Sequence, residues 1–209
     1  MNRRTFIRHS ALLFGAGPLL LPAWATAQKI PTFPEYYTYT GSYPQIDSQQ
    51  YRLHCSGLVA KPQEFTLEEL YQRSQAREIK TFHCVTGWVV QDVPWQGISL
   101  STFLAELQPS SAAKYVVFHS ADGVYVDSLS LEQARAPGVI LATHIAGQPL
   151  LRKGGYPLRL LVPQMYGYKS VKWVNRVELT SSRPMGTWER DGYAANAYIK
   201  KGFQWLDLL

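Results

Sequence analysis

Short stretches of alternating or β-branched apolar residues recur through most of this chain, and their spacing constrains the fold more than any other feature. The gaps between them are often too short for the crossover that joins parallel neighbours. The helical patterns are short and scattered. The sequence therefore predicts a mixed α+β domain, mostly β, with short peripheral helices. Strands are expected at 51–59, 79–86, 114–120, 124–129, 138–147, 157–163 and 172–180, and helices at 66–74, 99–107 and 130–137.

Three local signals support these elements. Apolar and polar residues alternate through 51–59, which places Cys55 in the core, where a free cysteine packs as a small hydrophobe. Thr66 and Glu69 have the spacing of a helix capping box. An Asp-Gly pair at 122–123 separates two strand patterns and predicts a hairpin.

The N-terminus has the ordered regions of an export leader. Arg3 and Arg4 are followed by an apolar stretch at 11–21, which is too short and too interrupted to span a bilayer. The small residues Ala25, Thr26 and Ala27 follow, in the A-x-A pattern of a cleavage site. The pattern resembles a twin-arginine signal, which implies the twin-arginine export machinery, cleavage after Ala27 and a periplasmic location. That machinery moves folded proteins, which suits a cofactor taken up before export.

The rest of the chain divides into two parts. Residues 28–50 are rich in Pro, Tyr, Thr, Ser and Gln and predict an irregular arm packed on the body. Residues 51–209 are expected to form a single domain. Residues 28–209 carry 18 Lys and Arg against 15 Asp and Glu, a net charge of +3. So small an excess gives no case for nucleic acid.

Several familiar motifs are absent from the sequence. It contains no G-x-G-x-x-G after a strand and no G-x-x-x-x-G-K-[ST], which removes the common nucleotide sites. It contains no C-x-x-C, so neither a thioredoxin-like pair nor a usual structural zinc site is indicated.

Cys84, in the stretch KTFHCVTGWVV, has four open interpretations. It could be a core residue, half of a disulfide with Cys55, a nucleophile, or a soft-metal ligand held rigidly at a strand end. The nucleophile would need His83, His119 or His144 as its base. His83 is adjacent to Cys84 in a strand and is expected on the opposite face.

The stretch 154–172 combines glycines with basic and hydroxyl side chains that suit a phosphate. Glycine lets backbone approach a ligand, arginine offers a fork of donors, and lysine adds a point charge. The residues of this candidate phosphate site are Gly154, Gly155, Arg159, Lys169, Ser170 and Lys172. The alternative is that the stretch is an ordinary basic strand and loop exposed to solvent.

Six segments together resemble the molybdopterin domain of the sulfite oxidase family, in order and spacing, over roughly residues 35–200. That family includes catalytic subunits of bacterial periplasmic protein-methionine-sulfoxide reductases. The segments are YRLHCSGLVAKPQEFTLEEL, FHCVTGW, YVVFHSADG, GGYPLRLLVP, YGYKSVKWVNRVELT and GTWERDGYAANAYI.

The resemblance implies a cofactor of molybdenum with one molybdopterin. Cys84 matches the cysteine whose thiolate binds the metal, and this makes it both the metal ligand and the catalytic residue. Ser120 falls where the family has Thr or Ser near the pterin. Tyr37, in the arm, matches a tyrosine that covers the cofactor.

The same resemblance assigns the anchor for the cofactor. Arg159 matches the arginine of a G-x-P-x-R element that contacts the cofactor, and Ser170, Val171 and Lys172 match the turn that holds the pterin phosphate. Gly154 stands where relatives commonly carry His or Asn, so one side-chain contact is expected to be missing there.

The resemblance implies an oxidoreductase that performs two-electron, oxo-transfer chemistry on a small-molecule substrate. No haem or flavin motif is present, so a separate redox partner, a soluble or membrane cytochrome, is expected. Sulfite is not the favoured substrate, because the residues after Cys84 lack the basic side chain of true sulfite oxidases. A monomer is expected, since the dimerisation domain of those oxidases has no counterpart here. The alternative is an exported non-catalytic domain that binds a pterin or a protein partner.

Overall fold

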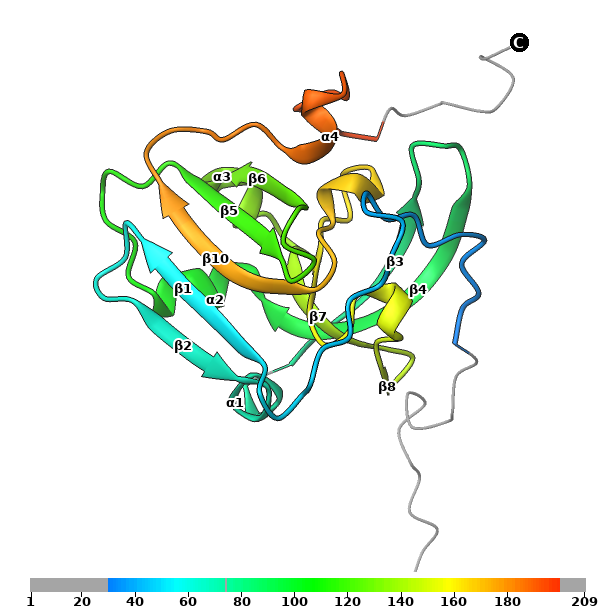
Figure 1. The fold of residues 1–209 in the computed structure, drawn as a ribbon, viewed down its shortest axis with the longest axis horizontal. Coiled ribbons are helices and arrows are strands. Elements are labelled where there is room, and N and C mark those ends of the chain that lie inside the picture. Colours follow the sequence, from blue (N-terminus) through cyan, green and yellow to red (C-terminus); the bar gives the residue numbers. More distant parts are fainter. Residues whose placement is uncertain (1–29, 74, 200–209) are drawn as a thin grey trace, which may run out of the picture.

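Two five-stranded sheets form the body of the protein (Figure 1). The computed structural model describes residues 30–73 and 75–199; the predicted leader at 1–27 lies outside them. The first sheet has the order β2-β1-β10-β5-β6, in which β1 and β10 are parallel and the other neighbours antiparallel. The second has the order β3-β4-β7-β8, with β9 also paired to β7, and all its pairs are antiparallel.

The strand bounds follow the predicted positions closely in most cases. In the first sheet they are β1 Arg52–Gly57, β2 Gln63–Thr66, β5 Tyr115–Ser120, β6 Val126–Ser130 and β10 Val174–Thr180. In the second they are β3 Ala76–His83, β4 Val89–Ser99, β7 Ile140–Ile145, β8 Gln148–Pro149 and β9 Arg159–Leu161.

Helices are short and peripheral. They are α1 Leu67–Gln72, α2 Leu100–Glu106, α3 Leu131–Ala134 and α4 Thr187–Arg190, with 3-10 turns η2 Arg152–Gly154 and η3 Gly167–Lys169. The predicted capping box closes the start of α1, where the Thr66 side chain accepts from the Glu69 backbone and Glu69 accepts from the Thr66 backbone. The predicted α+β class, mostly β, is confirmed.

One large core cluster joins the two sheets. Leu53 and Cys55 of β1 are buried on one face, as predicted, and pack in the same cluster as Leu141 of β7 and Leu160 of β9. A smaller cluster lies within the second sheet, where Phe33 of the arm is 6% exposed. In the described part of the chain, no helix is long and apolar enough to cross a membrane.

Two features of the second sheet differ from expectation. The sequence predicts no strand between 86 and 99, a stretch with Pro94 in its middle. The chain forms β4 there nevertheless, and the Pro94 carbonyl accepts a hydrogen bond from the Ala146 N–H at 2.8 Å. The strand expected at 79–86 ends at His83, three residues before its predicted end, so Cys84 lies outside the strand and begins the turn to β4.

Candidate active site

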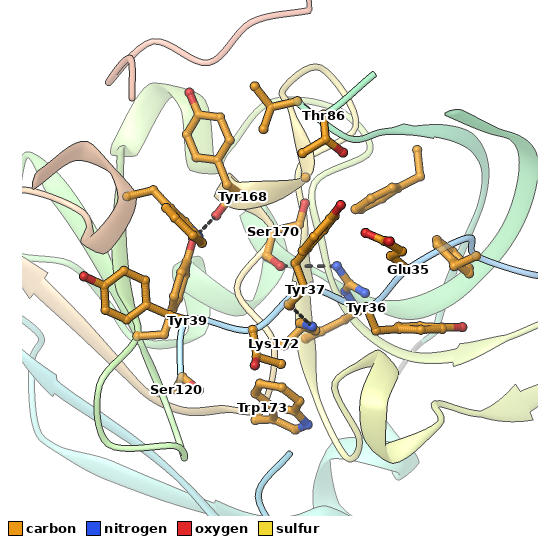
Figure 2. Close-up of a pocket in the computed structure, with 18 of the residues that line it drawn as sticks. Glu35, Tyr36, Tyr37, Tyr39, Thr86, Ser120, Tyr168, Ser170, Lys172 and Trp173 are labelled. Carbon is orange, nitrogen blue, oxygen red and sulfur yellow. Dashed lines mark hydrogen bonds between the residues drawn. The ribbon is translucent and has the colours of Figure 1, made fainter. Parts of the chain in front are cut away.

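A cavity of about 220 Å³ opens where the arm, the β3–β4 turn and the loops after β5 and β9 meet (Figure 2). Its lining is rich in aromatic residues and contains two cations and two carboxylates. Among the predicted site residues it includes Tyr37, Ser120, Arg159, Ser170 and Lys172. Other lining residues are Glu35, Phe82, Val85, Thr86, Trp88, Asp122, Tyr125, Tyr168, Trp173, Trp188 and Tyr193.

Arg159, the first residue of β9, is a buried cation, 4% exposed. It donates to the backbone carbonyls of Gly154 at 2.8 Å and Ser170 at 3.3 Å. Its Nε is buried and has no partner, and no carboxylate among the described residues forms an ion pair with it. Burial lowers the pKa of Arg159 to about 10. An uncompensated guanidinium in a cavity wall suits an anionic ligand.

Lys172 places a second cation in the same wall. Its ammonium donates to the Tyr37 carbonyl of the arm at 2.6 Å and lies 4.8 Å from the centre of the Trp173 ring. Burial first, and then repulsion from Arg159, lower the pKa of Lys172 to about 7. Trp173 itself has a φ of +54°, an uncommon backbone conformation of the kind that clusters at functional sites.

Gly155 is what allows the two cations to converge. Its φ is +114°, and a Cβ built on it would lie 2.9 Å from the Arg159 Cβ and 3.2 Å from the Lys172 Cβ. Only glycine meets both demands. Gly154 is different, because a Cβ there would lie 3.6 Å from the nearest atom, in the Tyr36 ring. Gly154 lines a small neighbouring hollow with Arg159 instead of the main cavity, and serves the site through its carbonyl.

Cys84 lies in a tight turn beside the cavity. Its N–H donates to the Trp88 carbonyl at 2.9 Å, its carbonyl accepts from Gly87 at 3.1 Å, and Gly87 has a φ of +102°. The half-buried thiol has its Sγ 3.1 Å from the Thr86 Oγ1, and Thr86 lines the cavity. The turn therefore presents the thiol next to the cavity wall.

The surroundings of Cys84 bear on its four interpretations. Both cysteines are free, and Cys84 is only partly buried, unlike Cys55. Across residues 30–73 and 75–199, no histidine nitrogen is hydrogen-bonded to the Cys84 sulfur; His119 bonds Glu178 and His144 bonds Thr143. The same residues hold no group of three or more His, Cys, Asp or Glu side chains able to bind a metal. A metal at Cys84 would therefore need its other ligands from a cofactor.

The remaining predicted residues take three different places. Ser120 is 4% exposed, and its Oγ accepts from the Asp122 N–H at 3.3 Å. The Tyr37 side chain is 51% exposed at the arm (Figure 2). Val171 does not line the cavity: it is 1% exposed and its side chain belongs to the main core. Only its neighbours on either side face the cavity.

Lys169 corrects one prediction made from residue type. It was expected to add positive charge for a phosphate, but its ammonium points away from the cavity, toward Asp127 and Glu189. Sequence reasoning also missed the aromatic wall of Tyr168, Trp188 and Tyr193. The only signal for that wall was the resemblance of the segment GTWERDGYAANAYI to the end of the family domain.

Comparisons with known proteins identify the family of this chain. Residues 40–188 match the family described as oxidoreductase molybdopterin binding domain. The chain belongs to that family. The catalytic subunit MsrP of protein-methionine-sulfoxide reductase from Pseudomonas syringae pv. tomato is 34% identical over 170 residues, covering 73% of this chain and 50% of MsrP. The putative reductase subunit YedZ1 of Azospira oryzae is 35% identical, covering 71% of this chain and 56% of YedZ1.

Two further comparisons extend the picture. The uncharacterized oxidoreductase YuiH of Bacillus subtilis is 32% identical, covering 74% of this chain and 78% of YuiH. The sulfane dehydrogenase SoxCD of Paracoccus pantotrophus has a TM-score of 0.63 at 22% identity, over 86% of this chain and 58% of that chain, and shows the shared fold. The chain thus spans about half the length of the first two relatives.

The described residues fit the family cofactor. The uncompensated Arg159, with its unpartnered buried Nε, and the nearby Lys172 suit a phosphate. The thiol of Cys84, without other metal-binding side chains beside it, suits a metal whose remaining ligands belong to the cofactor. The cation pair and the cysteine turn border one cavity.

Proposed function

We propose that this chain is the catalytic domain of a periplasmic molybdenum–molybdopterin oxidoreductase that exchanges an oxygen atom and two electrons with a small substrate. The observation that carries the proposal is the pair Arg159 and Lys172. Both are cations without a carboxylate ion-pair partner among the described residues, and both line the cavity that the Cys84 turn borders. A metal cofactor with an anionic tail could bind the Cys84 thiolate through its metal and the two cations through its anion.

Each residue then has a defined task. Cys84 would hold the metal through its thiolate, while Arg159, Ser170 and Lys172 would hold the phosphate. Gly155 permits the two cations to approach each other. Tyr37 lies over the cavity, and its backbone is tied to Lys172. When bound, the group would supply two-electron oxygen-atom transfer, and the protein would fix its geometry and keep one side open to substrate.

The favoured substrate is a neutral sulfoxide, reduced by the enzyme. The residues that follow Cys84 toward the cavity, Val85, Thr86 and Trp88, carry no charge that could hold an oxyanion such as sulfite. The opposite wall is aromatic, which suits a weakly polar molecule. The relative MsrP is named a methionine-sulfoxide reductase, which supports this choice.

The proposal includes a partner and a location. Electrons would come from a separate haem protein, since the sequence carries no haem or flavin motif. The name of YedZ1, a reductase subunit, supports an assembly of this kind.

Export would use the twin-arginine leader. Replacing Arg3 and Arg4 by lysine should leave the uncleaved protein in the cytoplasm, and unchanged export of this variant would refute the assignment.

The decisive experiment is metal analysis of protein purified from a molybdate-fed host. We expect about one molybdenum per chain, lost in Cys84→Ser and retained in Cys55→Ala, whose target is the buried core cysteine. The loaded protein should oxidise reduced benzyl viologen when methionine sulfoxide is added. A folded, metal-free wild type would overturn the proposal, whereas a loaded protein inactive with sulfoxides would overturn only the substrate.

A further inference from the structure

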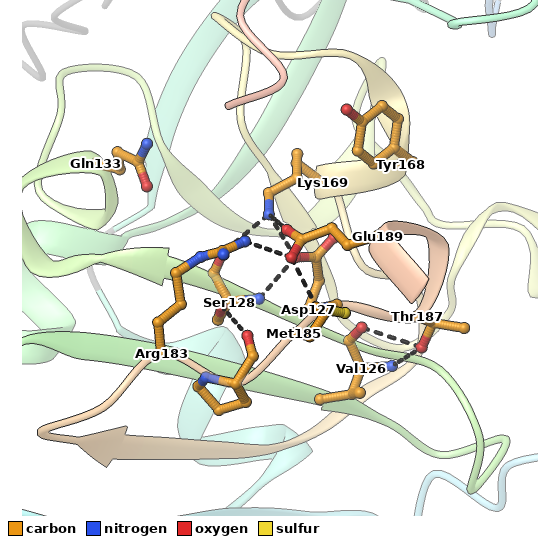
Figure 3. Close-up of polar contacts among 12 residues, drawn as sticks. Val126, Asp127, Ser128, Gln133, Tyr168, Lys169, Arg183, Met185, Thr187 and Glu189 are labelled. Atoms are coloured by element: carbon orange, nitrogen blue, oxygen red, sulfur yellow. Dashed lines mark hydrogen bonds and ion pairs between the residues drawn. The ribbon is translucent and has the colours of Figure 1, made fainter. Parts of the chain in front are cut away.

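Lys169 is the centre of a buried ion cluster with Asp127 and Glu189 (Figure 3). Its ammonium donates to Asp127 Oδ1 at 2.5 Å, to Glu189 Oε1 at 2.9 Å and to the Ser128 carbonyl at 3.0 Å. All three donors of the ammonium are therefore used. The Lys169 side chain is 1% exposed, and those of Asp127 and Glu189 are 2% and 4% exposed.

Glu189 extends the cluster into the segment that contains α4. Its Oε2 accepts from the Gly186 N–H at 3.0 Å and from the Arg183 guanidinium. Gly186 packs directly on Asp127, because a Cβ at Gly186 would lie 2.7 Å from the Asp127 Oδ1. With two cations and two carboxylates the cluster is neutral, and it holds three separate stretches of chain: β6, η3 and the α4 segment.

The sequence neighbours of the cluster line the cavity. Tyr168 and Ser170 flank Lys169, and Trp188 precedes Glu189. Trp188 packs on Tyr193, with ring centres 5.3 Å apart, and Tyr193 packs on Tyr168 at 5.4 Å. The cluster thus stands behind two adjoining parts of the cavity lining. One is the phosphate-binding turn at 166–172, whose Tyr168 also belongs to the aromatic wall, and the other is the α4 segment, which carries Trp188 and Tyr193.

We propose that Lys169 is a positioning residue that ties the phosphate-binding turn to the aromatic wall, so that the two sides of the cavity keep one spacing. The inference rests on the proposed function only in taking this cavity as the ligand site. Lys169 itself is not among the residues that line the cavity. Its directional bonds fix the turn against Glu189, and they act together with the hydrogen bond from the Tyr168 hydroxyl to the Ala194 carbonyl at 2.7 Å.

The test uses amide hydrogen exchange on the full mature protein, with and without molybdenum, and compares variants. Glu189→Gln weakens the tie to the aromatic wall, because a neutral amide oxygen replaces the carboxylate oxygen that accepts from Lys169, and it leaves the Lys169–Asp127 pair. Lys169→Met removes both ties, and Lys169→Arg retains the charge. Glu106→Gln is the control, because it breaks the partly exposed Arg73–Glu106 pair, at 3.0 Å, which belongs to α2 and lies outside the cavity lining.

We expect Glu189→Gln to speed exchange in 186–193 while 166–172 and the strand 115–120 keep their protection. Lys169→Met should speed exchange in both 186–193 and 166–172, and Lys169→Arg should restore most of the protection in 166–172. In the loaded enzyme, Glu189→Gln should raise the KM for methionine sulfoxide about tenfold with kcat unchanged.

Three results would overturn the inference. They are unchanged exchange in 186–193 for Glu189→Gln, equal acceleration in all segments including 115–120, and a Glu106→Gln control that behaves like the cluster variants. If Lys169→Met does not fold, Glu189→Gln decides alone. The exchange measurement does not require activity or bound metal. A metal-free wild type would therefore refute the proposed function, whereas the exchange rates would still test the role of Lys169.

Discussion

Two lysines three residues apart, Lys169 and Lys172, have opposite environments. Lys169 is 1% exposed and bonded to two carboxylates and a carbonyl. Lys172 is partly exposed in the cavity wall, donates to backbone carbonyls, and is repelled by Arg159. The two lysine side chains therefore point to opposite sides of the same loop, Lys169 toward Asp127 and Lys172 toward the arm.

The difference separates a structural charge from one available for binding. A buried cation balanced by carboxylates has no capacity left for a ligand and fixes the chain around it. A cation beside a second cation, without a carboxylate ion-pair partner in the described chain, is stabilised when an anion binds or when it loses its proton. The difference supports a structural role for Lys169 and the proposed ligand-binding role for Lys172, and the following variants test these two roles in order of decreasing effect.

Lys169→Met should have the largest effect on stability. It leaves Asp127 as a buried carboxylate without a cation, while Glu189 keeps only its pair with Arg183, so the free energy of unfolding should fall by about 3–5 kcal/mol. Urea denaturation at pH 7 would measure it. A loss below about 1 kcal/mol would mean that the cluster is not the internally balanced pairing described here.

Gly155→Ala should come next, because it acts on the convergence of Arg159 and Lys172. Alanine at a φ of +114°, with its Cβ 2.9 Å from the Arg159 Cβ, should cost about 2–3 kcal/mol of unfolding free energy. Gly154→Ala is the matched control and should change stability by less than about 0.5 kcal/mol, since its Cβ meets only ordinary contacts. Equal losses at both positions would contradict this account.

Lys172→Met should have the opposite sign from Lys169→Met. The folded-state pKa of Lys172 is about 7, against an ordinary value of 10.5, so below pH 7 the folded protein bears the full cost of its charge. In the wild type that cost is relieved as the pH rises from about 7 to 10.5. In metal-free protein the variant should therefore gain about 1–2 kcal/mol at pH 6 and much less at pH 9. A destabilised variant at pH 6 would contradict the assignment.

The sequence predicted local features better than those built from distant residues. The capping box of Thr66 and Glu69 and the buried face that includes Cys55 depend on neighbouring positions, and both are confirmed. The sequence also grouped Arg159 and Lys172, because they flank one strand and turn. It could not show that Lys169 turns to Asp127, 42 residues away. The strand through Pro94 was also missed, because its formation depends on pairing with β3 and β7.

The smallest expected effect concerns anion binding by metal-free protein. Sulfate does not titrate near neutrality, so any pH dependence belongs to the protein. Because Lys172 loses its proton above pH 7, sulfate affinity should fall by up to about tenfold per pH unit there, while Arg159 stays charged. The rise in Tm produced by a fixed sulfate concentration should therefore be larger at pH 6 than at pH 9. The difference corresponds to about 1 kcal/mol or less of unfolding free energy.

Lys172→Met should remove this pH dependence, and Lys169→Arg should keep it. A pH dependence that survives in Lys172→Met would place the titrating group elsewhere and remove the distinction between the two lysines.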